Sequence, residues 1–219
     1  PNVGANSLSA TRLPWEVTTP TPVIVSIAGA TSGDFADAAA AVRRRTALRG
    51  VLGVEVNLSV ANEANNGRAF AGDEYAVTKV IARVREHLPR NVMLAAKLTL
   101  GTDLVELSRA CLKSGADALV LGHAPVASSI DVTTLRPRAG TRAAMAGPAL
   151  LPLTVGGVFE VKAAMVAGRL PTAPIIAGGG IASVDAVVQA LAAGASAVQV
   201  GSALFRDPRA GVTLRDGLA

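Results

Sequence analysis

Glycines end two successive apolar segments in the C-terminal third of the chain, and this pattern favours a phosphate site. The first segment, Ile175–Gly180, closes on three glycines, and the second, Ala197–Ser202, closes on Gly201 and a serine. A helical pattern over Val184–Ala193 separates them, as between two parallel strands. Glycine lets another atom approach the backbone closely, and the positive N-terminal end of a helix attracts an anion. The alternative is that these glycines only make tight turns.

The elements that must position these glycines alternate between strand and helix. Six short apolar runs, each closed by a polar residue or glycine, have the pattern of buried parallel strands. These predicted strands are Val23–Ile27, Val54–Leu58, Val92–Leu98, Ala118–Leu121, Pro174–Ala177 and Ala197–Val200. In a (β/α)8 barrel, the loops after the last two strands form the usual phosphate site. We therefore predict an α/β fold of the (β/α)8 TIM-barrel type, incomplete, with about six parallel βα units in this chain.

Helices are predicted between the strands. The clearest one covers Glu74–Leu88, where apolar residues recur on one face at helical spacing. Asp103 is predicted to cap the next helix, and Ser183 to cap the helix over Val184–Ala193. One longer stretch, Gly122–Gly147, has no helical periodicity, and irregular segments of this length are usually functional.

Composition narrows the class of protein. The chain has 219 residues, of which 50% are hydrophobic and 3% aromatic, and its net charge is +5. This length and hydrophobic share suit a single domain over residues 1–219, in which residues 1–20 read as a loop. Nucleic-acid binding would need a broad basic face with interleaved aromatic residues, so we expect no nucleic-acid partner. Because no uninterrupted apolar run approaches about 20 residues, we expect no membrane segment.

Cysteine usage and the polar first residues predict a cytoplasmic protein. Cys111 is the only cysteine, so we expect neither a disulfide framework nor a thiol-based metal site. It falls on the apolar face of a predicted helix, which indicates a small core residue rather than a reactive thiol. The first residues are polar and include proline, so we expect no signal peptide. No metal site is predicted.

Five short motifs, in order along the chain, carry a resemblance to a known family. Residues 22–29 read PVIVSIAG, and residues 57–70 read NLSVANEANNGRAF. Residues 96–99 read AKLT, residues 115–119 read GADAL, and residues 146–149 read AGPA. The second motif is similar to the active-site loop N-[IVL]-S-C-P-N of dihydroorotate dehydrogenases, which continues with a glycine-rich loop and A-F. The others resemble the family's preceding barrel strand, its V-K-L-S strand, its G-A-D-G-L segment and its S-G-P-A turn.

The resemblance implies an FMN-dependent oxidoreductase that oxidises dihydroorotate to orotate in de novo pyrimidine biosynthesis. In the family, a base removes a proton beside the carbonyl group, and a hydride leaves the neighbouring carbon for flavin N5. The resemblance also implies that the chain lacks two N-terminal βα units of the barrel, with residues 1–20 as a remnant of that region. Soluble members of the family form dimers or heterotetramers, so a homodimer is allowed. The electron acceptor stays open.

The resemblance also assigns site residues one by one. Lys97 matches the lysine that contacts the flavin, where its charge would stabilise the reduced anion; the alternative is a lysine paired with a nearby carboxylate. Asn57 matches an asparagine that binds flavin or substrate. Asn62 matches the second substrate-binding asparagine, for which ordinary loop capping is the alternative. The matched contacts to the FMN phosphate and ribityl chain are Gly147, Gly178, Gly179, Gly180, Gly201 and Ser202.

The position of the catalytic base departs from the family pattern. Val60 stands where the family has cysteine or serine, and a valine cannot take a proton; Ala61 replaces the following proline. His123 stands beside the expected substrate, where the family has an asparagine. A histidine there, with an ordinary pKa of about 6.5, could replace the base or simply fill space. We therefore expect this chain to be a poor or inactive dihydroorotate dehydrogenase.

Two other functions stay open. Because Val60 is not a competent base, the chain could be a catalytically impaired relative that binds flavin or a partner subunit. It could also be a phosphate-binding barrel enzyme without flavin, such as an isomerase or aldolase, with Lys97 as a Schiff-base lysine. A visible absorption spectrum would separate a flavin protein from this last class.

Overall fold

A six-stranded parallel sheet organises the chain. The computed structural model describes residue 4 and residues 21–46, 50–62, 68–101, 103–138 and 143–218. The strands are ordered β1-β2-β5-β6-β11-β12, and every neighbouring pair is parallel. This confirms the predicted sheet, with small shifts at the strand ends. The bounds are β1 (Val23–Ile27), β2 (Val51–Asn57), β5 (Met93–Thr99), β6 (Ala118–His123), β11 (Ile175–Gly178) and β12 (Ala197–Gln199).

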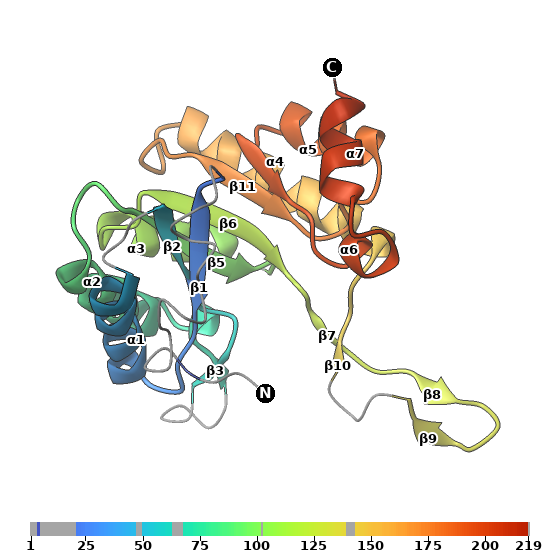
Figure 1. Cartoon of the computed structure of the whole chain (residues 1–219), viewed down its shortest axis with the longest axis horizontal. Coiled ribbons are helices and arrows are strands. Elements are labelled where there is room, and N and C mark those ends of the chain that lie inside the picture. The colour runs from blue at the N-terminus through green and yellow to red at the C-terminus, as the bar shows by residue number, and fades with distance from the viewer. Residues whose placement is uncertain are drawn as a thin grey trace.

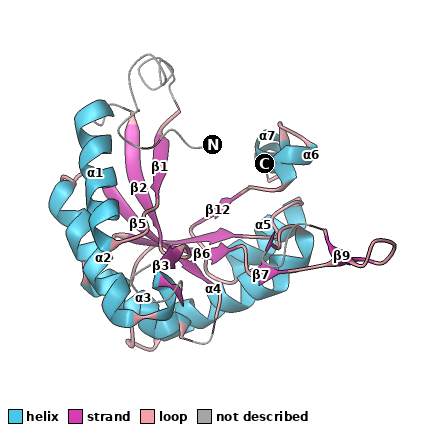
Figure 2. Cartoon of the chain, turned by 90° about the horizontal axis from the view of Figure 1, so that it is seen from below, coloured by secondary structure: helices cyan, strands magenta, loops and turns pink. Residues whose placement is uncertain are grey.

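The sheet curls, and helices cover its convex face (Figures 1 and 2). The result is a half-barrel of the TIM-barrel type, as the sequence predicts. Its outer helices are α1 (Ser32–Thr46), α2 (Glu74–His87), α3 (Leu104–Lys113), α4 (Leu151–Val166) and α5 (Val184–Ala192). The remaining short elements of the body are β3 (Ala61–Asn62), β4 (Arg68–Ala69), η4 (Phe70–Gly72), η5 (Pro148–Leu150), α6 (Ala203–Arg206) and α7 (Ala210–Asp216).

Alternation along the strands separates two apolar clusters. The larger one lies between the sheet and the helices and contains Val56, Leu98 and Leu121, all fully buried. The smaller one lies on the concave face and consists of Ala95, Ala118, Val120 and Ile176, with Met93 packed against it. Because successive side chains of a strand point to opposite faces, residues two positions further along these strands reach the concave face as well. Lys97, Gly122 and Gly178 hold such positions at the carboxyl ends of their strands.

Side-chain caps begin helices α2 and α5 but not helix α3. The Ser183 hydroxyl accepts from the backbone N–H of Ala186 in α5, which confirms the predicted cap. The Asp73 carboxylate, which was not predicted as a cap, accepts from the backbone N–H groups of Tyr75 and Ala76 at the start of α2. The prediction for α3 is wrong, because Asp103 makes no side-chain cap bond. Its ψ of 24° departs from the extended conformation that turns a capping side chain toward the first turn.

Helix α4 covers the sheet through contacts with α3, β6, β11 and α5. Together with η5 it forms a segment, Pro148–Val166, that is long enough and apolar enough to cross a membrane. No helix of this kind was expected from the sequence. Thr154, Val158 and Val161 of α4 are fully buried inside the fold, whereas Leu153, Phe159 and Val166 on its other side are exposed.

The stretch that sequence analysis treats as irregular, Gly122–Gly147, is in part an antiparallel arm that projects from the body (Figure 1). Strand β7 (Val126–Ala127) pairs with β10 (Ala143–Ala144), and β8 (Ile130–Asp131) pairs with β9 (Arg136–Pro137). The carboxylate of Asp131 accepts from the N–H groups of Thr134 and Thr133, which closes the turn and lowers the pKa of Asp131. These strands are too short for their pattern to be visible in the sequence.

Gly122 is expected to contribute to the stability of the fold, because β6 and β11 meet there without room for a side chain. Its φ is +116°, and a Cβ atom would overlap the carbonyl oxygen of Gly178. We expect Gly122→Ala to lower the free energy of unfolding by about 2 kcal/mol, measured by urea denaturation. Gly156→Ala is the matched control: a Cβ in the middle of α4 meets nothing within 4 Å, and alanine favours a helix. Equal stabilities of the two variants would contradict this reading of Gly122.

Candidate active site

All of the predicted cofactor residues except Asn57 line one cavity of about 300 Å³ at the carboxyl ends of β5, β6, β11 and β12. Lys97 reaches it from β5 and Gln199 from β12, while Gly122 and Ala124 border it from the β6 side. The carboxyl-end position is where parallel βα barrels bind their ligands. Seven of the residues predicted from the sequence are thereby brought together, namely Lys97, Gly147, Gly178, Gly179, Gly180, Gly201 and Ser202. Their individual roles remain predictions.

The glycines of this cavity are needed for different reasons. Gly180 has a φ of +78°, and a Cβ there would overlap the backbone of Leu151 at the start of α4. The turn after β11 therefore needs glycine for its own geometry. Gly201 is different, since its Cβ would meet no atom within 4 Å and its φ lies outside the left-handed region. The backbone around position 201 gives no steric reason for a glycine, and its predicted contact with a ligand stays a prediction.

Thr154 fixes the loop after β11, and sequence reasoning missed it. Its side chain is fully buried, and Oγ1 lies 3.0 Å from the carbonyl oxygen of Gly178 and 2.9 Å from that of Gly179. The hydroxyl proton is shared between these two oxygens. Both carbonyl groups therefore point toward α4, on which Thr154 lies.

A ring of three polar side chains lies beneath the cavity on the concave face. Lys97 Nζ donates to Glu55 Oε1 at 3.3 Å and to Gln199 Oε1 at 3.2 Å, and Gln199 Nε2 donates to Glu55 Oε2 at 2.6 Å. Ser26 Oγ also donates to Glu55 Oε1, at 2.8 Å. The side chains of Lys97 and Glu55 are 19% and 5% exposed. Lys97 therefore lines the cavity and also pairs with a carboxylate, which was the alternative given for it; its contact with a flavin stays a prediction.

Glu55 and Gln199 were not singled out from the sequence. The available signal was a carboxylate inside an otherwise apolar strand, which needs a buried partner. Glu55 pairs in register with Ala95 and Asn57 with Lys97, so Glu55 and Lys97 share a face of neighbouring strands. The contact with Gln199 could not be anticipated in this way, because β12 lies at the opposite end of the sheet order.

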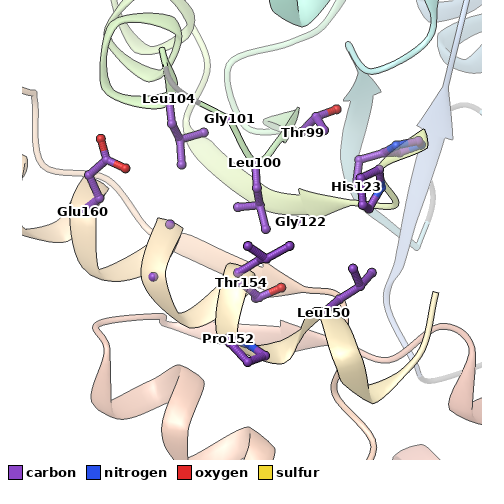
Figure 3. A pocket seen from close by; sticks show the side chains of 14 residues that line it. Thr99, Leu100, Gly101, Leu104, Gly122, His123, Leu150, Pro152, Thr154 and Glu160 are labelled. Atoms are coloured by element: carbon purple, nitrogen blue, oxygen red, sulfur yellow. The ribbon is translucent and has the colours of Figure 1, made fainter. Parts of the chain in front are cut away.

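His123 lines a second cavity of about 400 Å³, which shares Gly122 and Leu150 with the first. Figure 3 shows His123 at one end of this cavity and Glu160, on α4, at the other. His123 Nδ1 lies 3.1 Å from the carbonyl oxygen of Ala124. Since a carbonyl oxygen can only accept, Nδ1 carries the proton and Nε2 of the neutral ring has a free lone pair.

The surroundings of His123 favour its neutral form. Burial lowers the pKa of His123 below 6.5, and the nearby positive charge of Lys97 acts in the same direction. The hydrogen bond with Ala124 and the negative charge of Glu55 act in the opposite direction without cancelling the shift. At neutral pH the imidazole is therefore a proton acceptor rather than a cation.

Other predicted residues lie outside the first cavity or cannot be placed. Asn57 ends β2, and its Oδ1 accepts from the backbone N–H of Ser59 at 3.1 Å. Ser59 Oγ in turn accepts from Thr99 Oγ1 at 2.6 Å, which links the ends of β2 and β5. The backbone of Asn62 belongs to β3, but its side chain lies outside the described part of the chain. Its predicted role in substrate binding stays a prediction.

The predicted losses of reactivity at Val60 and Cys111 agree with their packing. Val60 is partly buried and packs against the large apolar cluster between sheet and helices. Cys111 is fully buried on α3, and burial raises the pKa of its thiol to about 12. Neither side chain offers a base to the cavities. Within the described residues, no group of three or more histidine, cysteine, aspartate or glutamate side chains could hold a metal ion.

A curled parallel sheet with helices outside it and a ligand-sized cavity at its carboxyl ends defines a protein of the TIM-barrel class. In fold, the chain is similar to the crystal structure of a dihydroorotate dehydrogenase from Eimeria tenella solved with ferulenol. The TM-score is 0.65 at 19% identity, over 85% of this chain and 53% of that one. The sequence model of the dihydroorotate dehydrogenase family matches residues 1–219, and the chain belongs to this family.

Two relatives differ in the acceptor that their names give. The chain is 35% identical to the catalytic subunit of a dihydroorotate dehydrogenase B (NAD(+)) from Geotalea daltonii, over 99% of this chain and 68% of the relative. It is 33% identical to a putative dihydroorotate dehydrogenase A (fumarate) from Pediococcus pentosaceus, over 99% of this chain and 69% of the relative. The chain thus spans about two-thirds of the length of these relatives. The family is one of oxidoreductases.

Proposed function

We propose that the chain binds FMN in the first cavity and oxidises dihydroorotate to orotate, slowly, as a step of pyrimidine synthesis. The observation that carries this proposal is the cavity where Lys97 meets the glycine loops after β11 and β12. A cation at the floor of the cavity and glycine loops at its rim suit a ligand that has a phosphate group and an electron-rich ring. Membership of the dihydroorotate dehydrogenase family supports the same cofactor and substrate.

In this proposal the residues of the chain bind and orient, and one of them moves a proton. FMN supplies the redox chemistry, because its ring accepts a hydride. The loops around Gly180 and Ser202 hold the phosphate end. Lys97 stabilises negative charge on the ring, and Asn57 helps to orient the substrate at the end of β2. His123 Nε2 takes the proton from the substrate carbon, since its lone pair is free and burial keeps the ring neutral.

A titration with FMN tests the proposed function directly. We expect the chain to quench flavin fluorescence on binding, and dihydroorotate to bleach the bound flavin without oxygen. Riboflavin, which lacks the phosphate, is the matched control and should bind more weakly. Failure to bind FMN would contradict the proposal, whereas binding without bleaching would favour a catalytically impaired flavin-binding relative. This second function is favoured by Val60, which packs against the core and cannot act as a base at the family's base position.

A further inference from the structure

The carboxylate of Glu55 has no place in the proposed chemistry, although it is the most buried charge beside the cavity. It accepts from Ser26, Lys97 and Gln199, side chains of three different strands. Two of these donors, Lys97 and Gln199, line the cavity, while Glu55 itself does not. Any effect of Glu55 on a ligand therefore passes through these two side chains.

We propose that Glu55 is a positioning residue that sets the charge and orientation of Lys97 and Gln199 toward the bound flavin. This inference rests on the proposed function. The Glu55 carboxylate holds Lys97 Nζ at 3.3 Å and the Gln199 amide at 2.6 Å, and Gln199 Oε1 completes the ring with Lys97 at 3.2 Å. Bonds of this kind to a charged group are roughly twice as strong as neutral ones. The ammonium is thereby fixed at the floor of the cavity.

The geometry leaves one ammonium proton for a ligand. An ammonium group has three N–H donors, and among the described residues Glu55 and Gln199 accept two of them. Glu55 thus has two consequences for Lys97. It directs the third donor toward the cavity, and it compensates part of the positive charge that a flavin would meet.

The second consequence gives Glu55 a measurable signature. Reduced FMN is an anion at its ring, and it is favoured by a positive charge nearby. Removing the carboxylate leaves Lys97 uncompensated and strengthens the preference for the reduced form. Removing Lys97 leaves the carboxylate alone and has the opposite effect. If Glu55 only supported the fold, its removal would not shift this preference in the direction opposite to the removal of Lys97.

The experiment compares the dissociation constants of oxidised and reduced FMN for the 219-residue chain and its variants, by anaerobic redox titration. We expect Glu55→Gln to raise the preference for reduced FMN about tenfold, as for a unit charge about 10 Å away at an effective dielectric constant of about 20. Lys97→Met is expected to lower it by a similar factor. Glu55→Asp keeps the charge but moves it away from Lys97, so a smaller rise is expected.

The control is Asp131→Asn on the arm, which changes the net charge equally and should leave the preference unchanged. Urea denaturation checks that each variant is folded. A native chain that fails to bind FMN would contradict the proposed function and this inference with it. FMN binding with equal preferences in the native and Glu55→Gln chains would contradict this inference alone. This inference would also be contradicted if Glu55→Gln and Lys97→Met shifted the preference for reduced FMN in the same direction, or if neither Glu55→Gln nor Glu55→Asp folded.

Discussion

Replacing His123 with alanine is expected to slow the bleaching of bound FMN by dihydroorotate by about 10²–10³-fold, within the range that general bases contribute. His123 lines one of the cavities, its Nε2 has a free lone pair, and its surroundings favour the neutral form. Val60, at the family's base position, packs against the core and has no proton acceptor. The measurement is stopped-flow absorbance under anaerobic conditions. Because the side chain lines a cavity rather than the core, the variant is expected to fold.

The pH dependence of the same rate separates a base from a space-filling residue. A base acts in its neutral form, so the native rate should rise with pH as the imidazole loses its proton. Burial lowers the pKa of His123, so the midpoint of the rise should lie below pH 6.5, the ordinary histidine value. His123→Ala should lose this rise. The second histidine of the chain, His87 at the end of α2, provides the matched control, since His87→Gln should change neither rate nor profile.

Rapid bleaching that is indifferent to His123→Ala would place the base elsewhere. The candidates are then the hydroxyl pair of Ser59 and Thr99 and the carboxylate of Glu160, since Thr99 and Glu160 line the same cavity as His123. Such a result would also question the alignment of the loop that follows Asn57. It would leave the FMN site untouched, because the cavity around Lys97 does not depend on His123.

The sheet and the cavity glycines were predictable from the sequence because each depends on a local pattern. Buried parallel strands read as short apolar runs, and the turns around Gly180 and Gly201 end two of them. Helix α2 was predictable from its apolar face, and all of Val77, Val80, Ile81 and Val84 are fully buried. In each case the residues that decide the structure are neighbours in the sequence or lie one helical turn apart.

The polar ring beneath the cavity could not be predicted in the same way. Glu55 and Gln199 are 144 positions apart, and their contact exists only because the sheet curls far enough to bring β12 toward β2. The capping bond of Asp103 failed for a related reason: the residue type was suitable, but the local backbone angle was not. The arm after β6 could not be predicted either, because strands of two residues are too short to show an alternating pattern in the sequence. Side-chain partners across the barrel depend on tertiary curvature, which no single segment encodes.

Gly201→Val is expected to weaken FMN binding about 100-fold while leaving the free chain as stable as before. The backbone at position 201 does not need glycine, because a Cβ meets nothing within 4 Å and φ is not left-handed. The added methyl groups would project from a residue that lines the cavity and occupy space that the ligand needs. Overfilling a packed site costs about 1–3 kcal/mol, and about 2.8 kcal/mol corresponds to a factor of 100. Fluorescence titration gives the affinity, and urea denaturation gives the stability.

This prediction decides between the two interpretations of the glycines at the strand ends. If they serve only tight turns, Gly201→Val should reduce stability and affinity together, as Gly180→Ala should because its Cβ would overlap Leu151. If Gly201 instead makes room for a ligand, Gly201→Val should reduce the affinity for FMN and leave the free energy of unfolding unchanged. Gly211→Val on α7 is the matched control: its Cβ also meets open space, but it does not line this cavity, so FMN affinity should be unchanged. Unaltered affinity in Gly201→Val would remove the loop after β12 from the proposed site and leave only the loop after β11 to hold the phosphate.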